Sequence, residues 1–173
     1  MRQKWEHEDE YTQLRAALRK AKLEGKALSQ DLEMRLQELD ERLWQEMVAG
    51  LPELAPYRTI FEAFEKTTIR LSVPFPDIVS GNFKIGGDDK FFCNLSDGIR
   101  SIQIFPLESR HYYDIEIYDE GVCYKGQTSS LEEATIVLSR WLVERCAIEE
   151  LHRQFPWMAD QPFKLSGPRM TLE

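Results

Sequence analysis

The sequence predicts an α+β fold, and three observations support that prediction. Two apolar stripes with helical spacing occupy residues 3–24 and 29–49, a run of short alternating segments begins at residue 83, and a long helical pattern follows it. Helical patterns that flank a run of strands, instead of alternating with them, are typical of α+β domains. We therefore expect an N-terminal helical hairpin, an antiparallel β-meander of four to six strands, and a C-terminal helix packed on the sheet.

The first two predicted helices each carry one apolar stripe. The stripes are formed by Tyr11, Leu14, Leu18 and Ala21, and by Leu32, Leu36, Leu39, Leu43 and Met47. Gly25 separates the two patterns, and Ser29 stands where an N-cap of the second helix belongs. Two such helices most simply pair as an antiparallel hairpin, so residues 1–50 are predicted to form one unit. The same stripes leave open self-association of the chain through residues 3–49.

Residues 51–158 are predicted to form the α+β domain. A short third helix is expected over residues 53–66, with Pro56 in its first turn. "TIRLSV" (68–73) alternates apolar and polar residues and predicts a strand. From residue 83 onward the turn signals "GGDD", "SDG" and "DEG" separate the strands of a meander.

The C-terminal part begins with the clearest helical pattern of the chain, "TSSLEEATIVLSRWLVERC", for which Ser129 or Ser130 is the expected N-cap. A shorter helix, "AIEELHRQF", follows and is closed by Pro156. Residues 159–173 carry two prolines and show no periodicity, so an extended C-terminal tail is predicted.

Composition and charge exclude several classes of protein. The net charge of −8 disfavours binding to nucleic acid, which requires Lys and Arg to neutralise phosphates. No apolar run approaches the roughly 20 residues needed to cross a bilayer, and the charged start "MRQKWEHEDE" lacks the apolar core of a secretory signal. Three cysteines without C-x-x-C spacing indicate reduced thiols, so a cytoplasmic protein without a membrane partner is expected.

No pattern in the sequence indicates a cofactor, a metal site or a catalytic site. The histidines His7, His111 and His152 lack zinc-binding spacing, and "GGDDK" has the composition of a hairpin turn. The protein is therefore predicted not to be an enzyme. One alternative stays open, an enzyme of unrecognised type that uses His111 with Cys123 or a pair of carboxylates.

The segment "HYYDIEIYDE" (111–120) holds four carboxylates and three tyrosines in one predicted strand. Alternation places Tyr113, Ile115 and Ile117 on a core face and the polar residues on the other. That second face is either a solvated outer surface or a surface that recognises a basic protein, because carboxylates accept bonds from Arg and Lys while aromatic rings supply contact area. The predicted partner-binding residues are Tyr112, Asp114, Glu116, Tyr118, Asp119 and Glu120.

Residues 124–158 carry the resemblance to a known group. A last strand ending in Gly, a Ser-capped helix with a Trp-Leu pair, and a short helix closing on "FPWM" resemble the C-terminal part of small acidic immunity proteins of bacterial polymorphic toxin systems. The resemblance implies a non-enzymatic α+β protein that binds a cognate toxin and occludes its active site. The N-terminal helical pair departs from the compact form of that group, and no functional residue is carried over.

Taken together, these patterns predict a bacterial, cytoplasmic, non-enzymatic protein-binding module. The most concrete form of the prediction is an immunity protein that neutralises a basic toxin domain through its acidic, tyrosine-bearing strand. The main alternative is a structural or oligomerisation protein that acts through the N-terminal hairpin.

Overall fold

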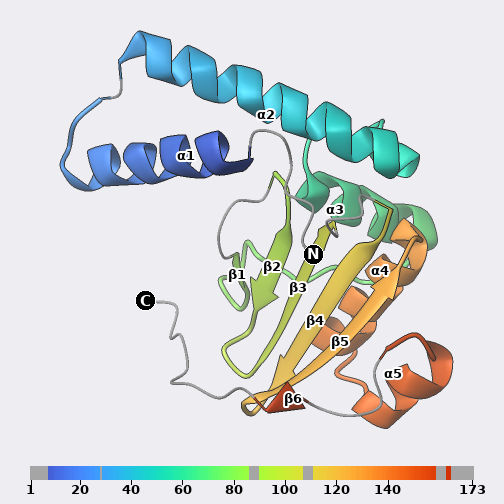
Figure 1. The fold of residues 1–173 in the computed structure, drawn as a ribbon. Helices are drawn as coiled ribbons and strands as arrows, with labels where there is room; N and C mark the ends of the chain where they lie inside the picture. Colours follow the sequence, from blue (N-terminus) through green and yellow to red (C-terminus); the bar gives the residue numbers. More distant parts are fainter. Residues whose placement is uncertain (1–7, 28, 86–89, 107–110, 159–162, 165–173) are drawn as a thin grey trace.

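The computed structural model describes residues 8–27, 29–85, 90–106, 111–158 and 163–164 (Figure 1). The helices are α1 (Glu8–Leu23), α2 (Gln30–Gly50), the short 3-10 helix η1 (Pro52–Leu54), α3 (Ile60–Leu71), α4 (Leu131–Leu138), the π-helix η2 (Ser139–Val143) and α5 (Ile148–Gln154). The strands are β1 (Lys84–Ile85), β2 (Cys93–Ser96), β3 (Arg100–Pro106), β4 (Tyr113–Asp119), β5 (Val122–Thr128) and β6 (Phe163–Lys164).

The described strands form one antiparallel sheet in which each strand pairs with the next along the chain, in the order β1 to β6. The central strands β3, β4 and β5 pair over seven residues each, whereas β1 and β6 add two residues at either edge. In Figure 1, α3 and α4 lie against one face of this sheet, and the opposite face is turned towards the viewer. The predicted α+β fold with a β-meander and a C-terminal helix on the sheet is confirmed.

The hydrophobic core lies between the sheet and its helices. Alternation along β3 and β4 turns one set of side chains towards α3 and α4 and buries it completely. The fully buried residues on these two strands are Ile102, Ile104, Tyr113, Ile115 and Ile117, and they meet Ala63, Phe64, Val137, Leu138 and Trp141 from the helices in one cluster.

The N-terminal helices form the predicted hairpin, and its second helix reaches the core. The Arg35 guanidinium binds both carboxylate oxygens of Glu10, with donor–acceptor distances of 2.6 and 2.8 Å, and so ties α2 to α1. Trp44 and Met47, near the C-terminal end of α2, are buried in the same cluster as the sheet residues. The end of the hairpin therefore contributes to the core of the α+β domain, and the predicted boundary after residue 50 stays a prediction.

Local capping explains where two of the helices begin. The Ser29 hydroxyl accepts from the backbone N–H of Leu32, as the sequence predicts for the start of α2. Of the two candidate caps of α4 it is Ser130 that serves, because its hydroxyl accepts from the N–H of Glu133. A remote residue completes this helix start, since the Glu53 carboxylate in η1 accepts from the N–H of Leu131 at 2.6 Å.

The predicted secondary structure is wrong between residues 53 and 73. The third helix begins after the N-cap Thr59 and continues to Leu71, so "TIRL" is helical and no strand occupies residues 68–73. Thr67 and Thr68 are buried on the same side of α3 as Phe64, and α4 packs beside this helix. Burial against a neighbouring helix thus overrides the short local alternation.

The helix predicted from "TSSLEEATIVLSRWLVERC" is regular only as far as Leu138, and a π-helix follows from Ser139 to Val143. Within the predicted tail 159–173 the structure describes residues 163–164, which pair with β5, and the rest lies outside the described residues. The predicted turn "GGDD" (86–89) lies outside them as well. Among the helices that the structure describes, none combines the length and the apolar character needed to span a membrane.

Candidate functional site

The candidate site is the side of the sheet that faces away from α3 and α4. We call it the polar face. It comprises the outward-directed residues of the three central strands, namely Ser101, Gln103, Phe105, Asp114, Glu116, Tyr118, Cys123, Lys125 and Gln127. In the described part of the chain no helix lies over it (Figure 1). Apart from the buried Cys123, its side chains are half-buried or exposed, whereas the alternate residues Tyr113, Ile115 and Ile117 of β4 are completely buried.

Strand register builds the centre of the polar face as a row across three strands. Glu116 on β4 stands opposite Gln103 on β3 and Lys125 on β5. Cross-strand neighbours of this kind lie about 5 Å apart at Cβ, so their side chains interact directly. A carboxylate at the middle of the row therefore has a cation on one side and an amide on the other.

The Glu116 carboxylate is bound on both oxygens. Its Oε1 forms an ion pair with the Lys125 ammonium, and its Oε2 accepts a hydrogen bond from the Tyr118 hydroxyl. The hydrogen bond to Glu116 raises the pKa of Lys125, and the negative charge of Asp114 adds to that rise. Burial, followed by the bond to Glu116, raises the pKa of Tyr118, so this phenol stays neutral. With 13% of its side chain exposed, Glu116 is a mostly buried carboxylate whose negative charge is balanced by Lys125.

The six predicted contact residues do not share one face. Asp114, Glu116 and Tyr118 lie on the polar face, and Tyr112 is exposed immediately before β4. Asp119 continues the core-facing alternation of β4, with its carboxylate 3.9 Å from the Arg100 guanidinium.

Glu120, the last of the predicted contact residues, is exposed in the tight turn between β4 and β5, at a φ of 46°. It thus lies at the end of the sheet, outside the polar face. The four charges of the segment "HYYDIEIYDE" are therefore divided between two faces and a turn, and Glu116 and Asp119 lie beside the cations Lys125 and Arg100. The sequence contained no signal for this division, because Arg100 and Lys125 come from neighbouring strands.

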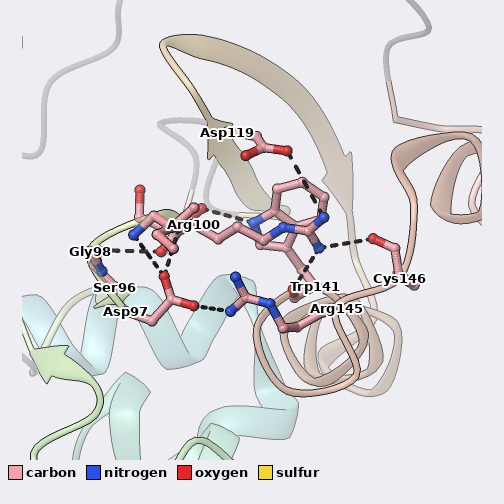
Figure 2. A network of polar contacts seen from close by, with 10 residues as sticks. Ser96, Asp97, Gly98, Arg100, Asp119, Trp141, Arg145 and Cys146 are labelled. Carbon is pink, nitrogen blue, oxygen red and sulfur yellow. Dashed lines mark hydrogen bonds and ion pairs between the residues drawn. The ribbon is translucent and has the colours of Figure 1, made fainter.

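A second polar cluster lies at the end of the sheet that carries Asp119 (Figure 2). The Arg100 guanidinium stacks on the Trp141 ring, 4.0 Å from the ring centroid, and donates to the backbone carbonyls of Trp141 at 3.2 Å and Cys146 at 2.9 Å. Trp141 Nε1 donates in turn to the carbonyl of Ser101 at 3.2 Å. The sequence reasoning missed Arg100, which fastens the helix end to the sheet.

Asp97 organises the β2–β3 turn next to this guanidinium. Its Oδ1 accepts from the backbone N–H groups of Ile99 at 2.9 Å and Arg100 at 2.7 Å, and its Oδ2 binds the Arg145 guanidinium. Burial by itself would raise the pKa of this carboxyl, but the two backbone bonds and the Arg145 cation hold it below its ordinary value. The "SDG" turn signal is confirmed, with Gly98 at a φ of 90°.

The proposed pairing of His111 with Cys123 is wrong. Cys123 pairs with Tyr118, whereas His111 precedes Tyr113, the first residue of β4. The five residue steps from Tyr113 to Tyr118 span about 17 Å of strand, far beyond hydrogen-bond reach. Nδ1 of His111 lies 3.4 Å from the carbonyl oxygen of Gly50 instead.

The cysteines are also poorly suited to nucleophilic chemistry. Burial raises the pKa of Cys93, Cys123 and Cys146, which keeps each thiol protonated, whereas a nucleophilic cysteine needs a lowered pKa. Among the residues that the structure describes, no three His, Cys, Asp or Glu side chains come together in a group that could hold a metal ion.

The polar face thus presents one tyrosine, two glutamine amides and two carboxylates, of which Glu116 is ion-paired with Lys125. No protein-family model matches the chain, and neither a curated protein nor a solved structure shows significant similarity to it.

Proposed function

We propose that the chain is a non-enzymatic protein-binding module that docks a basic partner on the polar face, and that the partner is a cognate toxin domain. The observation that carries the proposal is the composition of this face. One sheet surface without a covering helix in the described residues combines the tyrosine and the carboxylates of β4 with two glutamines from its neighbours. Aromatic rings beside hydrogen-bonding groups are the usual content of protein interfaces.

Charge arrangement decides how such a face would act. Because the positive charge of Lys125 already balances the negative charge of Glu116, the face attracts a cationic partner less strongly than the acidic sequence of β4 implies. Attraction over distance then depends on the chain as a whole, whose net charge is −8, and on the exposed Glu120 at the end of β4. In the bound state the carboxylates would take the place of the anionic groups that a basic toxin site normally binds.

The test is a stopped-flow association assay with the toxin-like protein encoded next to this chain. Asp114→Lys combined with Glu116→Lys should slow association about tenfold or more and flatten its salt dependence, because the change of four charge units places two new cations beside Lys125 and makes the face repel a basic partner. Glu41→Lys combined with Glu65→Lys is the matched control, since both carboxylates are exposed on α2 and α3 and the net charge changes equally. Equal rates for the two double variants would remove the polar face from the proposal.

Two checks keep this test interpretable. Glu116→Gln preserves an acceptor for the Tyr118 hydroxyl and leaves Lys125 without its ion pair, so its thermal unfolding measures how much the row contributes to the fold. A neighbouring reading frame that encodes no toxin-like protein would contradict the immunity function while leaving protein binding open to other partners.

Self-association through the hairpin remains the alternative, and one observation favours it. Leu23, Leu32 and Met34 are exposed on α1 and α2, with 84, 39 and 53% of their surface accessible. Because Trp44 and Met47 belong to the core, removal of residues 1–50 would damage the fold. Light scattering on the full chain, compared with a Leu32→Glu and Met34→Glu variant, is the appropriate measurement, and a monomeric full chain would exclude this alternative.

A further inference from the structure

The eight residues from Ser139 to Cys146, which we call the π-segment, gather three unfavourable features. The chain runs as a π-helix, in which the N–H of Glu144 donates to the carbonyl of Ser139 at 3.1 Å. Such turns are rare and less stable than a regular α-helix. Arg145 has a φ of 54°, the left-handed region that costs a non-glycine residue roughly 1 kcal/mol.

The third unfavourable feature lies inside the molecule. The Ser139 hydroxyl is fully buried, and no hydrogen-bond partner for it is found in the described part of the chain. A buried hydroxyl without a partner opposes the folded arrangement, because the same group would bind water if the segment opened. All three features weaken the same eight residues.

Two kinds of contact oppose this weakness. Trp141 and Leu142 are buried in the core cluster, and one side chain of the sheet, Arg100, binds the backbone of the segment. Arg100 binds the π-segment at two positions, because its Nη1 donates to the carbonyls of Trp141 and Cys146. Its guanidinium plane also covers the Trp141 ring (Figure 2). Asp97 adds a second attachment through Arg145. With 16% of its side chain exposed, Arg100 makes these bonds in a setting where water competes poorly.

We infer that the π-segment is a latched element that opens separately from the rest of the fold, and that Arg100 is the latch. Opening requires the loss of the two carbonyl bonds and the ring contact, and the withdrawal of Trp141 and Leu142 from the core cluster, while the strand pairing and the contact between α3 and α4 stay in place. The segment is then the low-stability part of the helical layer, in the sense that local opening costs less than global unfolding. Opening exposes Cys146, which is buried in the closed form.

The chain contains its own reporters for this inference. Cys146 ends the π-segment and is 9% exposed, whereas Cys93 in β2 is completely buried; both belong to the same hydrophobic cluster. Alkylation of the folded full chain with N-ethylmaleimide, followed by peptide mass spectrometry, measures how often each thiol becomes accessible. In the wild-type chain Cys146 should react faster than Cys93, because it needs only the local opening.

Removal of the latch should widen the difference between the two thiols. In Arg100→Met the ratio of the Cys146 rate to the Cys93 rate should rise at least tenfold, since two hydrogen bonds to a charged donor are lost. Arg70→Met is the matched control, because Arg70 pairs with Glu132 on the exposed side of α3 and α4, and it should leave the ratio unchanged. If Arg100→Met does not fold, Arg100→Lys keeps the charge but cannot reach both carbonyls in the same way, and its ratio should also rise.

Two results would overturn the inference. Equal reaction rates of Cys146 and Cys93 in the wild-type chain would mean that the π-segment opens only when the whole molecule unfolds. An unchanged ratio in the folded Arg100 variant would mean that Arg100 contributes to global stability and is not a local latch.

Discussion

Replacement of Gly126 by alanine tests the packing at the end of β5. A Cβ atom built on Gly126 would lie 2.8 Å from both Cε3 and Cζ3 of Trp157 and 3.0 Å from the Cα of Met158. Real Cβ contacts are longer than this, so either the indole ring or the backbone must move. The backbone has little freedom, because Met158 forms an isolated antiparallel bridge with Gly126. The indole ring must therefore give way, and it packs on Phe155 with the ring centroids 5.5 Å apart.

The magnitude follows from two opposing effects. Forcing an extra methyl group into a filled site costs about 1–3 kcal/mol. Against this, alanine lowers the conformational entropy of the unfolded chain. Where the native backbone tolerates alanine, as the extended strand does here, this stabilises the folded state by about 0.4–1 kcal/mol. Gly126→Ala should therefore lower the free energy of unfolding by about 1–2 kcal/mol. With a urea m-value of about 2–3 kcal/mol/M, the midpoint should fall by roughly half a molar.

Equilibrium urea unfolding followed by far-ultraviolet circular dichroism gives both the midpoint and the m-value. The same substitution in a Trp157→Leu background supplies the decisive comparison, because the smaller side chain leaves room for the methyl group. There Gly126→Ala should be neutral or stabilising, which gives a coupling energy of about 1 kcal/mol or more between the two positions. An unchanged or higher midpoint for Gly126→Ala alone, or the same loss in both backgrounds, would refute the steric reasoning.

Two further predictions concern backbone strain and pH. Ser72 ends α3 at a φ of 55° and is exposed, so Ser72→Gly should raise the free energy of unfolding by about 0.5–1 kcal/mol and raise the melting temperature in calorimetry; a lower melting temperature would contradict this. The pKa of Asp97 is lower in the folded chain than in the unfolded one, so its stabilisation is present above the unfolded carboxyl pKa of about 4 and is lost as the pH falls through the folded value. The difference in unfolding free energy between the wild-type chain and Asp97→Asn should therefore shrink below about pH 4, and a difference that stays constant from pH 7 to pH 3 would exclude Asp97 as the source.

Much of the fold was predictable because it depends on local chemistry. Ser29 and Ser130 precede their helices with a hydroxyl that the backbone itself requires, and the alternation of Tyr113, Ile115 and Ile117 assigns one face of β4 to the core. Gly98 and Gly121 adopt the positive φ values that their turns need. Each of these features involves residues close together in the chain.

The misassigned region shows where local patterns stop being sufficient. "TIRLSV" alternates as a strand does, yet it continues a helical face in which Phe64, Thr67 and Thr68 turn towards the core. Counting the threonines as apolar would have extended the stripe and favoured the helix. Whether a threonine is buried depends on the neighbouring helix, and that contact is absent from the local sequence.

The candidate site depended even more on tertiary structure. The sequence alone determined that β4 is acidic and rich in tyrosine, that its alternate residues are buried, and that the helices flank a meander. Register and packing alone decided that Lys125 neutralises Glu116, that Asp119 faces Arg100 on the opposite side, and that Arg100 closes the π-segment. The physical reason is range: caps, turns and alternation act within a few residues, whereas the charge that a surface presents depends on side chains that the fold brings together from distant strands and helices.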